Sequence, residues 1–507
     1  MARMKPVLGI DFGTTNTSAA WVDRKANLHM VPVTEVDHVL PSVVWYASRD
    51  RFVVGAGARQ KIVDDPQNTV FGLKRFLGRQ YRSEFVTRNK DRHLFKIVEG
   101  PDGTCAAEVH GEVKSLTTIS FNIIHRIVEL ANAAAGAGQE FEECVLTVPA
   151  HFGYRQRQIV RTAAEMAGLE VRAMINEPTA AALYYTRSRG GEQTLLVFDL
   201  GGGTFDATLI AIEGHLVKVL ATGGDAFLGG AGFDERIAGA LARRFQNDYG
   251  IDLSSQKVVM QRLIFASELA KIILSSEERA NVRVVFAGEK NGRPIDLDYA
   301  MNREMLEQMI APLIERCVGA CEELLARKGL KASDVGELIL VGGQTRTPAL
   351  QRRLQAVFRT DPAKNINPEL SVAAGAAMLG RSLDMPAGPG LVDVVSVPIW
   401  MMVPGKGPME AIGANTAVPC ARRMPIENRP PPGMPLALVL YEALEAASVD
   451  REILGSVRVE ADWLALNPGP LELEVKMTQS FSLEISAHAG PAIHPLDLVA
   501  PRPAQRR

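Results

Sequence analysis

Two short segments place an aspartate at the end of an apolar strand and follow it with glycine and threonine residues. The first segment is GIDFGTTNT, which contains Asp11, and the second is DLGGGTFD, which contains Asp199 and Asp206. Glycines lack Cβ atoms, so several backbone N–H groups can point into one concavity that suits phosphate oxygens. An ordinary tight hairpin would explain one such segment equally well, but two matched segments favour a phosphate-binding site.

The acidic residues of these segments require a further chemical group, because carboxylates and phosphates repel each other. A hydrated Mg²⁺ would remove the conflict, since Mg²⁺ keeps most of its waters and needs only one or two carboxylates nearby. We therefore interpret Asp11, Asp199 and Asp206 as residues that share one cation with bound phosphates. A third glycine turn, LVGGQTRTP, leads from a strand into a helix, with Thr347 at the N-cap and Pro348 in the first turn.

An α/β fold must position these segments. The stretch SLTTISFNIIHRIVELANAAAG has the apolar spacing of a helix, and EECVLTVPA reads as a buried strand. A second helix, RQRQIVRTAAEMAG, ends at Gly168. Each of the two matched segments is followed by its own α/β region. We expect two lobes of related design, with one loop from each lobe facing a shared cleft.

The pattern changes after LGRSLDMPAGPG. A short apolar stretch, LVDVVSV, contains Asp393, and short strands separated by Pro, Gly and Asn turns follow it. We predict a nucleotide-binding domain over residues 1–384, a linker over 385–396, a small β-sandwich over 397–490 and a disordered tail over 491–507. The tail prediction depends on the prolines of the last stretch, which are too many for a helix.

The composition limits the classes of function. A chain of 507 residues, 47% hydrophobic and 22% charged, is typical of a globular protein of several domains. The formal net charge of −2 gives no general attraction for nucleic acids or anionic membranes. No apolar stretch reaches the roughly 18–20 residues that cross a bilayer. The start MARMKPVLGI has no apolar signal region, so we expect a cytoplasmic protein.

The five cysteines are scattered, which argues against a disulfide framework and for a reducing compartment. Cys317 and Cys321 lie one helical turn apart, and this spacing could suggest a metal-binding pair. No second pair of ligands accompanies them, so packing in the core is the favoured explanation.

Several segments follow one another in an order that resembles the seventy-kilodalton heat-shock chaperones. They are GIDFGTTNT, DPQNTVFGLKRFLGR, TVPAHFGYRQRQ, INEPTAAAL, DLGGGTFD and LVGGQTRTP. The resemblance covers residues 5 to about 382 and extends more weakly to about 488. It implies the actin and sugar-kinase nucleotide fold, an α/β ATPase with two lobes around an ATP cleft. In the family an apolar linker joins this domain to an all-β sandwich that holds unfolded peptide.

The resemblance implies catalytic roles for positions that match the family's motifs. Lys74 matches the lysine that positions the attacking water, although by itself it would suit an exposed helix position. Glu177 in INEPT matches the acid near that water, and Thr204 and Asp206 match residues that complete the site and help to bind potassium. The implied catalytic residues are Lys74, Glu177, Asp199, Thr204 and Asp206, and the implied magnesium residues are Asp11, Asp199 and Asp206.

Other matched positions concern the nucleotide and its effect on the linker. The implied phosphate and adenosine contacts are Gly13, Thr14, Thr15, Gly201, Gly202, Gly203, Glu268, Lys271, Ser275, Gly342, Gly343 and Arg346. Pro149 and Arg157 resemble the proline switch and its arginine relay, and Asp393 matches the acid of the linker. The implied cofactors are ATP or ADP, Mg²⁺ and K⁺.

The chain departs from the family at its partner-binding surfaces. After TVPA, relatives carry a tyrosine and an Asn–Asp pair, whereas this chain has His151, Gly153 and Tyr154. Ala173 replaces an expected arginine, and the acidic hairpin after GGGTFD is shortened to IEGHLV. These positions help to dock the J-domain cochaperone in relatives, so we expect altered stimulation.

Two further departures concern the nucleotide and the peptide. In LGGAGFD, Ala231 and Gly232 replace an acidic pair, which is expected to change nucleotide handling. The chain stops soon after its last strand, where the family has a long helical lid, and its linker lacks the usual leucine run. A sandwich without this lid should release peptide quickly, because the latch that slows dissociation is missing.

The resulting functional hypothesis is an ATP-dependent chaperone-like protein that hydrolyses ATP to switch its β-domain between peptide-binding states. Expected partners are unfolded peptide or a dedicated client, with a J-domain cochaperone and a nucleotide exchange factor on altered surfaces. One alternative is a nucleotide-controlled scaffold for a dedicated partner. A small-molecule kinase is less favoured, because the β-domain has no place in a kinase.

Overall fold

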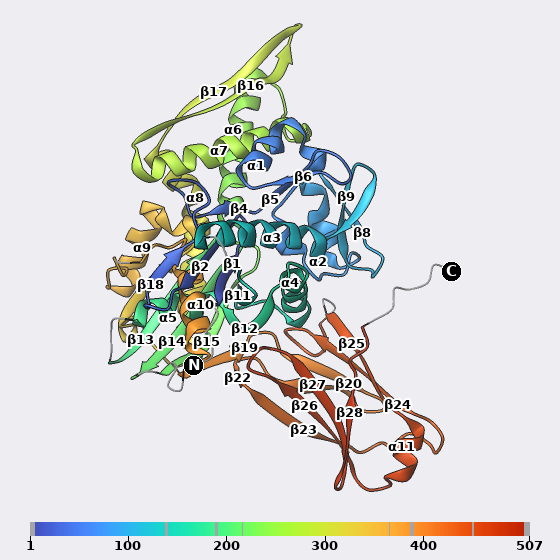
Figure 1. Ribbon diagram of the computed structural model, residues 1–507. Helices are drawn as coiled ribbons and strands as arrows, with labels where there is room; N and C mark the ends of the chain where they lie inside the picture. Colours follow the sequence, from blue (N-terminus) through green and yellow to red (C-terminus); the bar gives the residue numbers. More distant parts are fainter. Residues whose placement is uncertain are drawn as a thin grey trace.

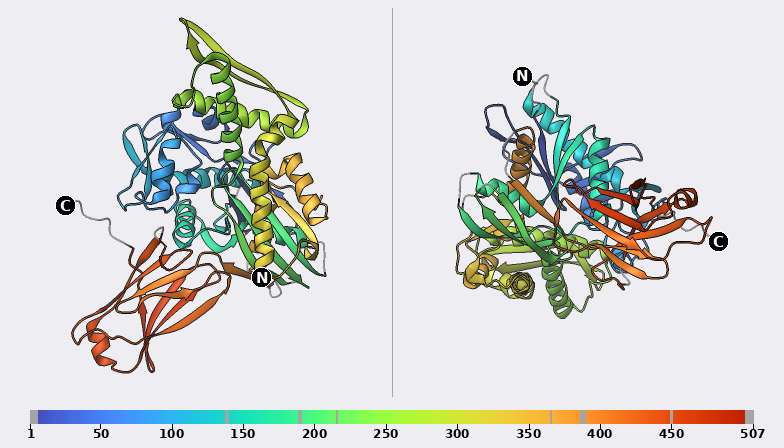
Figure 2. Two further views of the ribbon diagram at one scale, coloured as in Figure 1. Left: turned by 180° about the vertical axis from the view of Figure 1, so that it is seen from behind. Right: turned by 90° about the horizontal axis from the view of Figure 1, so that it is seen from below.

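The computed structural model describes residues 6–136, 140–187, 191–214, 216–364, 366–385, 390–448 and 451–500. Two α/β lobes lie beside each other, and an all-β region lies below them next to α4 (Tyr154–Met166) in Figure 1. Figure 2 shows that this region projects from one end of the lobes. We call its residues 399–496 the β-module.

The central sheets of the two lobes share one strand pattern. In each sheet, the first strand of an antiparallel hairpin also pairs in parallel with a strand from later in the chain. This agrees with the two related lobes that the matched segments predicted. The first sheet has the order β12 (Glu170–Asn176), β11 (Glu143–Val148), β1 (Leu8–Phe12), β2 (Asn16–Val22) and β3 (Leu28–Met30), and β4 (Leu40–Pro41) pairs with β2. The second has the order β18 (Glu337–Val341), β13 (Glu192–Leu200), β14 (Phe205–Glu213), β15 (Leu216–Asp225), β19 (Gly390–Val395) and β22 (Thr416–Val418).

Smaller sheets extend each lobe. One comprises β5 (Val43–Tyr46), β6 (Phe52–Val54) and β7 (Thr69–Phe71), and another comprises β8 (Lys96–Glu99), β9 (Cys105–Val109) and β10 (Glu112–Ser115). The hairpin of β16 (Arg279–Lys290) and β17 (Arg293–Asn302) projects beyond the second lobe, as Figure 1 shows.

The helices of the first lobe are α1 (Ala56–Asp64), α2 (Glu84–Asn89), α3 (Leu116–Ala135) and α4. Those of the second lobe are α6 (Gly230–Tyr249), α7 (Lys257–Ser276), α8 (Arg303–Arg327) and α9 (Pro348–Phe358). As predicted, α4 is followed by Gly168 with a positive φ, and α9 begins at Pro348. Cys317 and Cys321 of α8 are fully buried in the core of the second lobe, as the packing interpretation predicted.

Two helices, α5 (Glu177–Thr186) and α10 (Ser371–Ser382), join the lobes. A Cβ atom on Gly375 of α10 would lie 1.8 Å from the carbonyl oxygen of Ala180, so only glycine permits this close approach. The apolar cluster around both helices contains Val145 and Ile175 of the first sheet and Val197 of the second. The lobes therefore share one buried contact beneath the cleft.

The β-module consists of two four-stranded antiparallel sheets around one apolar cluster. Buried and more accessible side chains alternate along its strands, as expected for sheets with one face in a core. One sheet has the order β21 (Gly407–Ile412), β20 (Ile399–Val403), β24 (Leu436–Glu442) and β25 (Glu452–Val459). The other has the order β23 (Cys420–Ile426), β26 (Leu471–Met477), β27 (Leu483–Ala489) and β28 (Ala492–Leu496), and the short α11 (Ala461–Leu466) precedes β26.

The prediction of a disordered tail over residues 491–507 is wrong for its first part. Ala492–Leu496 pairs with β27, and the backbone of Val499 exchanges two hydrogen bonds of 2.9 Å with Ser456. The prolines misled the prediction because β28 is an edge strand, where the missing N–H of Pro495 is tolerated. Residues 501–507 lie outside the described part of the chain.

Half of the predicted linker, residues 385–396, is built into the second lobe. Its residues 390–395 form β19, which pairs in parallel with β15 and antiparallel with β22. Residues 386–389 of this linker lie outside the described residues. Among the helices of the described ranges, none combines the length and the apolar character that crossing a membrane requires.

Candidate active site

An open cavity lies where the two matched hairpin turns meet. Both lobes contribute to its wall, together with the third glycine turn. The predicted residues that line it are Asp11, Gly13, Thr14, Thr15, Lys74, Glu177, Asp199, Gly201, Gly202, Thr204, Gly342 and Gly343. Asn16, Ser18 and Glu369 also line the cavity and were not predicted from the sequence.

The two hairpin turns approach each other so closely that they need glycine. A Cβ atom on Gly202 would lie 1.8 Å from Oγ1 and 2.9 Å from Cβ of Thr15 on the opposite lobe. The second turn is also tied to the first residues of α6, since the N–H of Gly230 donates to the carbonyl oxygen of Gly201 at 2.9 Å. The N-terminus of this 20-residue helix therefore adjoins the turn, which favours negative charge there.

One lysine is held among the carboxyl groups at the base of the cavity. Lys74 is buried, and its Nζ donates to Oε1 of Glu177 at 2.7 Å and to the carbonyl oxygen of Phe12. The hydroxyl of Thr147 donates to Asp11 at 3.2 Å. These contacts fix the ammonium group and one carboxylate on the first-lobe side of the cavity.

The carboxyl groups outnumber the cation that faces them. Burial, and then the charge of Glu177, raises the pKa of Asp11 to about 7. Burial raises the pKa of Asp199 well above its usual value, and the charges of Glu177, Asp206 and Asp11 add to this effect. Lys74 lowers the pKa of both Asp11 and Asp199 without reversing either shift. The site is therefore short of positive charge.

The donor groups fit a hydrated magnesium ion better than a tightly ligated metal. Within the described ranges, no three His, Cys, Asp or Glu side chains form a group that could hold a metal ion alone. Mg²⁺ needs only one or two carboxylates when phosphate oxygens and water complete its shell. Asp11 and Asp199, which both line the cavity, provide such carboxylates.

The predicted adenosine contacts lie outside the cavity wall. Glu268 of α7 pairs with Arg59 of α1 at 3.0 Å, so this ion pair connects the two lobes. Lys271 pairs with Asp234 at 2.8 Å, and the Ser275 hydroxyl donates to the carbonyl oxygen of Lys271. Arg346 pairs at 3.0 Å with Glu369, which itself lines the cavity. Of the other predicted residues, Gly203 and Asp206 also lie outside this wall.

Comparison with known families shows which family the chain belongs to. The family model described as Hsp70 protein matches residues 7–428, from the start of β1 to the end of β23. The chain belongs to the Hsp70 protein family. The resemblance given by its motifs is thus confirmed, and the two lobes are those of the actin-like ATPase fold. The protein is an ATP hydrolase of the chaperone type, and such ATPases generally use ATP and ADP with Mg²⁺.

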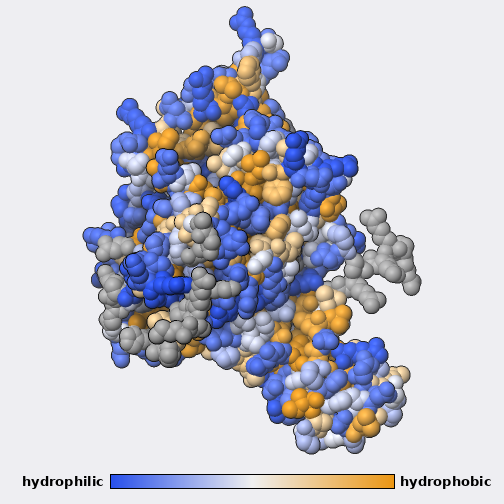
Figure 3. All heavy atoms as spheres, viewed as in Figure 1, coloured by the Kyte–Doolittle hydropathy of each residue, from blue (hydrophilic) through white to orange (hydrophobic). Residues whose placement is uncertain are grey.

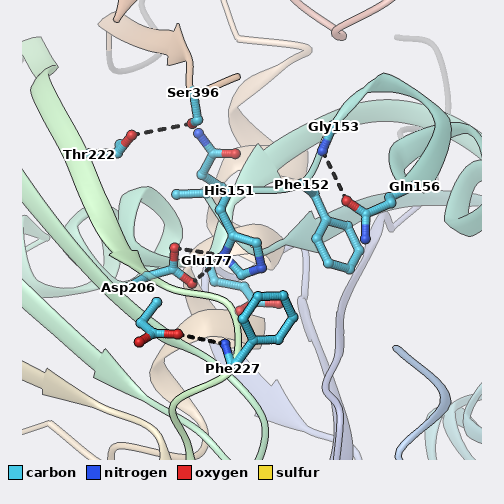
Figure 4. A network of polar contacts seen from close by, with 12 residues as sticks. His151, Phe152, Gly153, Gln156, Glu177, Asp206, Thr222, Phe227 and Ser396 are labelled. Carbon is cyan, nitrogen blue, oxygen red and sulfur yellow. Dashed lines mark hydrogen bonds and ion pairs between the residues drawn. The ribbon is translucent and has the colours of Figure 1, made fainter. Parts of the chain in front are cut away.

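Two residues beside the site of this Hsp70 protein were not assigned to it by sequence. Nη2 of Arg75 donates to the carbonyl oxygen of Gly203 at 2.9 Å and so links the lobes. The sequence feature that could have identified Arg75 is its position next to Lys74 in FGLKRFLG. His151, treated only as part of a partner surface, contacts Asp206 (Figure 4).

Substituting Gly202 tests whether the contact between the turns matters for nucleotide binding. We expect Gly202→Ala to weaken ADP binding by at least about tenfold, because overpacking of this kind typically costs about 1–3 kcal/mol. The matched control is Gly319→Ala in α8, where a Cβ atom would meet nothing within 4 Å. Calorimetric titration with Mg·ADP measures both affinities, and wild-type affinity in Gly202→Ala would contradict the prediction.

Proposed function

We propose that this Hsp70 protein hydrolyses ATP between its lobes and uses the bound nucleotide to dock and release the β-module, which binds peptide. The observation that carries the proposal is a buried polar network that begins at Asn176, next to Glu177, and reaches the linker strand and the β-module. Hsp70 proteins generally bind unfolded peptide clients, J-domain cochaperones and exchange factors. We propose the same partner classes and a cytoplasmic location for this chain.

The residues at the cavity base suit phosphoryl transfer to water. Lys74, held by Glu177, would place a positive charge beside the transferred phosphoryl group and orient the attacking water. The backbone N–H groups of Gly201 and Gly202 and the hydroxyl of Thr204 would hold phosphate oxygens. When bound, Mg²⁺ neutralises charge on the phosphates.

The network starts at the residue next to the catalytic acid. Glu177 begins α5 and Asn176 is its N-cap residue. The side-chain amide of Asn176 donates to Asp393 of β19 at 2.5 Å and accepts from Nη2 of Arg157 at 2.7 Å. The hydroxyl of Thr179 also donates to Asp393, at 3.3 Å. A shift of Glu177 with nucleotide would therefore move the contacts that hold the linker strand.

The β-module contacts the first turn of α4. Oε1 of Glu442, at the end of β24, accepts a hydrogen bond of 2.7 Å from the backbone N–H of Tyr154. A Cβ atom at position 153 would lie 2.3 Å from Oε2 of Glu442, so Gly153 makes room for the carboxylate. The carboxylate also suits the positive end of the helix dipole. The departures at positions 153 and 154 thus serve a contact within the chain.

Three arginines of α4 strengthen this contact. Their partners in the β-module are the Glu452 carboxylate at 3.4 Å from Arg155, the Phe481 ring at 4.0 Å from Arg157, and the Ser480 carbonyl oxygen at 3.1 Å from Arg161. Arg157 belongs both to this interface and to the network around Asp393. Its guanidinium is therefore the group that links the nucleotide site, the linker strand and the β-module.

Apolar side chains support the peptide-binding role of the β-module. Figure 3 shows them gathered on the part of the β-module that lies nearest the lobes. Val439, which lies in β24, and Leu444, which follows it, are among the exposed large apolar residues of the β-module. Exposed apolar groups of this kind are typical of surfaces that bind other chains.

Docking of the β-module should strengthen as the pH falls from 8 to 6. Burial raises the pKa of Glu442 to about 7, above the ordinary value of about 4.3, and it also raises the pKa of Glu452 and Asp393. A group whose pKa is raised by docking favours the docked state at low pH, and this contribution is lost as the pH rises through about 7. Fluorescence energy transfer between dyes at Val36→Cys and Leu466→Cys, in a Cys420→Ser background, measures docking.

The matched variant is Glu442→Gln, whose amide oxygen can still accept from Tyr154 but which has no charge to desolvate. We expect it to dock with a smaller dependence on pH than the wild type. Docking that weakens on acidification, or an equal dependence in both proteins, would contradict this role of Glu442.

The chaperone function is tested by refolding of a denatured reporter enzyme with ATP, with and without a J-domain protein. We expect refolding by the wild type and by Lys364→Ala, which changes an exposed lysine, and none by Lys74→Ala. Single-turnover ATP hydrolysis by Lys74→Ala should fall at least about 100-fold. Hydrolysis without refolding would favour a nucleotide-controlled scaffold, and turnover raised by a sugar or polyol would favour a kinase.

A further inference from the structure

A histidine of the first lobe holds an aspartate of the second. Nδ1 of His151 lies 3.0 Å from Oδ1 and 3.1 Å from Oδ2 of Asp206, and Figure 4 shows the imidazole pointing at this carboxylate. The Asp206 side chain is only 3% exposed, and that of His151 is 26% exposed. An ionised carboxylate only accepts hydrogen bonds, so opposite such a carboxylate Nδ1 is the atom that carries the proton and donates it.

The ring of His151 is oriented by the site itself. It packs edge-on against Phe152, with ring centroids 5.7 Å apart, and Phe152 is buried. Nζ of Lys74 lies 5.3 Å from the centre of the same Phe152 ring. His151 and Lys74 therefore contact one aromatic ring, and the histidine is fixed relative to the catalytic lysine.

Asp206 needs such a donor because of its neighbour across the hairpin. It pairs directly with Asp199 in the β13–β14 register, and its charge is one of the causes that raise the pKa of Asp199. A buried carboxylate beside another carboxylate requires a nearby positive or N–H group. The family resemblance implied that K⁺ fills this role at Asp206. In this chain an N–H group already lies within hydrogen-bond distance of both carboxylate oxygens, so the donor set does not call for that ion.

We propose that His151 is a positioning residue for ATP hydrolysis, which orients Asp206 across the cleft in place of a monovalent cation. ATP hydrolysis by this protein is therefore independent of K⁺. The contact also bridges the lobes, so Asp206 is held correctly only when the lobes are closed. The inference rests on the ATPase activity of the family and not on docking of the β-module.

The first test uses the wild-type protein and needs no substitution. Single-turnover ATP hydrolysis is measured in potassium chloride and in choline chloride at equal ionic strength, with Mg²⁺ present in both. We expect rates that agree within about twofold. A rate at least about tenfold lower in choline chloride would overturn the proposal, since Asp206 would then depend on the cation.

The second test compares His151→Ala with His151→Asn and with the surface control His125→Ala. We expect His151→Ala to lower the hydrolysis rate about 10- to 100-fold while ADP affinity changes less than about threefold, because misplacement of a positioning group affects the chemical step most. Potassium chloride should partly restore the hydrolysis rate of His151→Ala. The rate of His151→Asn should lie between those of His151→Ala and the wild type, since the asparagine amide can donate to Asp206. Unchanged hydrolysis in His151→Ala would overturn the proposal.

Thermal unfolding of the Mg·ADP complexes gives a readout that does not depend on activity. Replacing choline chloride with potassium chloride should raise the melting temperature of His151→Ala. The same replacement should leave the melting temperatures of the wild type and of His125→Ala unchanged. Equal stabilisation of all three proteins by potassium would show that the ion binds regardless of His151 and would overturn the proposal.

Discussion

The structure depends on a group of carboxylates buried between two lobes with too little positive charge to balance them. Asp11, Asp199 and Glu177 line the cavity, and Lys74 is the cation that lowers the pKa of both aspartates. Such an arrangement is costly until a metal ion and phosphates complete it. The glycine turns allow the two lobes to approach each other closely at this point.

In the proposed function, this constraint is also the means by which a small change at the nucleotide would reach the β-module. Glu177 faces Lys74 and begins α5, and its neighbour Asn176 binds both Asp393 and Arg157. Arg157 in turn contacts the Phe481 ring in the β-module. These side chains are buried or half-buried, so under the proposed mechanism a shift at one end would be transmitted as a packing change.

The sequence predicted what depends on local residue types and missed what depends on distant pairing. The two Asp–Gly turns were recognisable because aspartate and glycine have restricted roles at strand ends, and most of their predicted residues line one cavity. The role of β19 as a sheet strand and the contact of Glu442 with Tyr154 required partners far away in the chain. β28 pairs with the neighbouring β27 and was missed because of its prolines. His151 was interpreted as a partner-surface residue because sequence alone does not show that it lies opposite Asp206.

The most direct test of the charge imbalance is thermal unfolding of wild type and Asp199→Asn, each with and without Mg·ADP. Without nucleotide, the variant should melt at a higher temperature than the wild type, because a neutral amide removes a buried like charge. With Mg·ADP, it should gain much less stability than the wild type, because the ion loses one of its carboxylates. An Asp199→Asn protein that melts lower without nucleotide and gains the full increment from Mg·ADP would contradict the account.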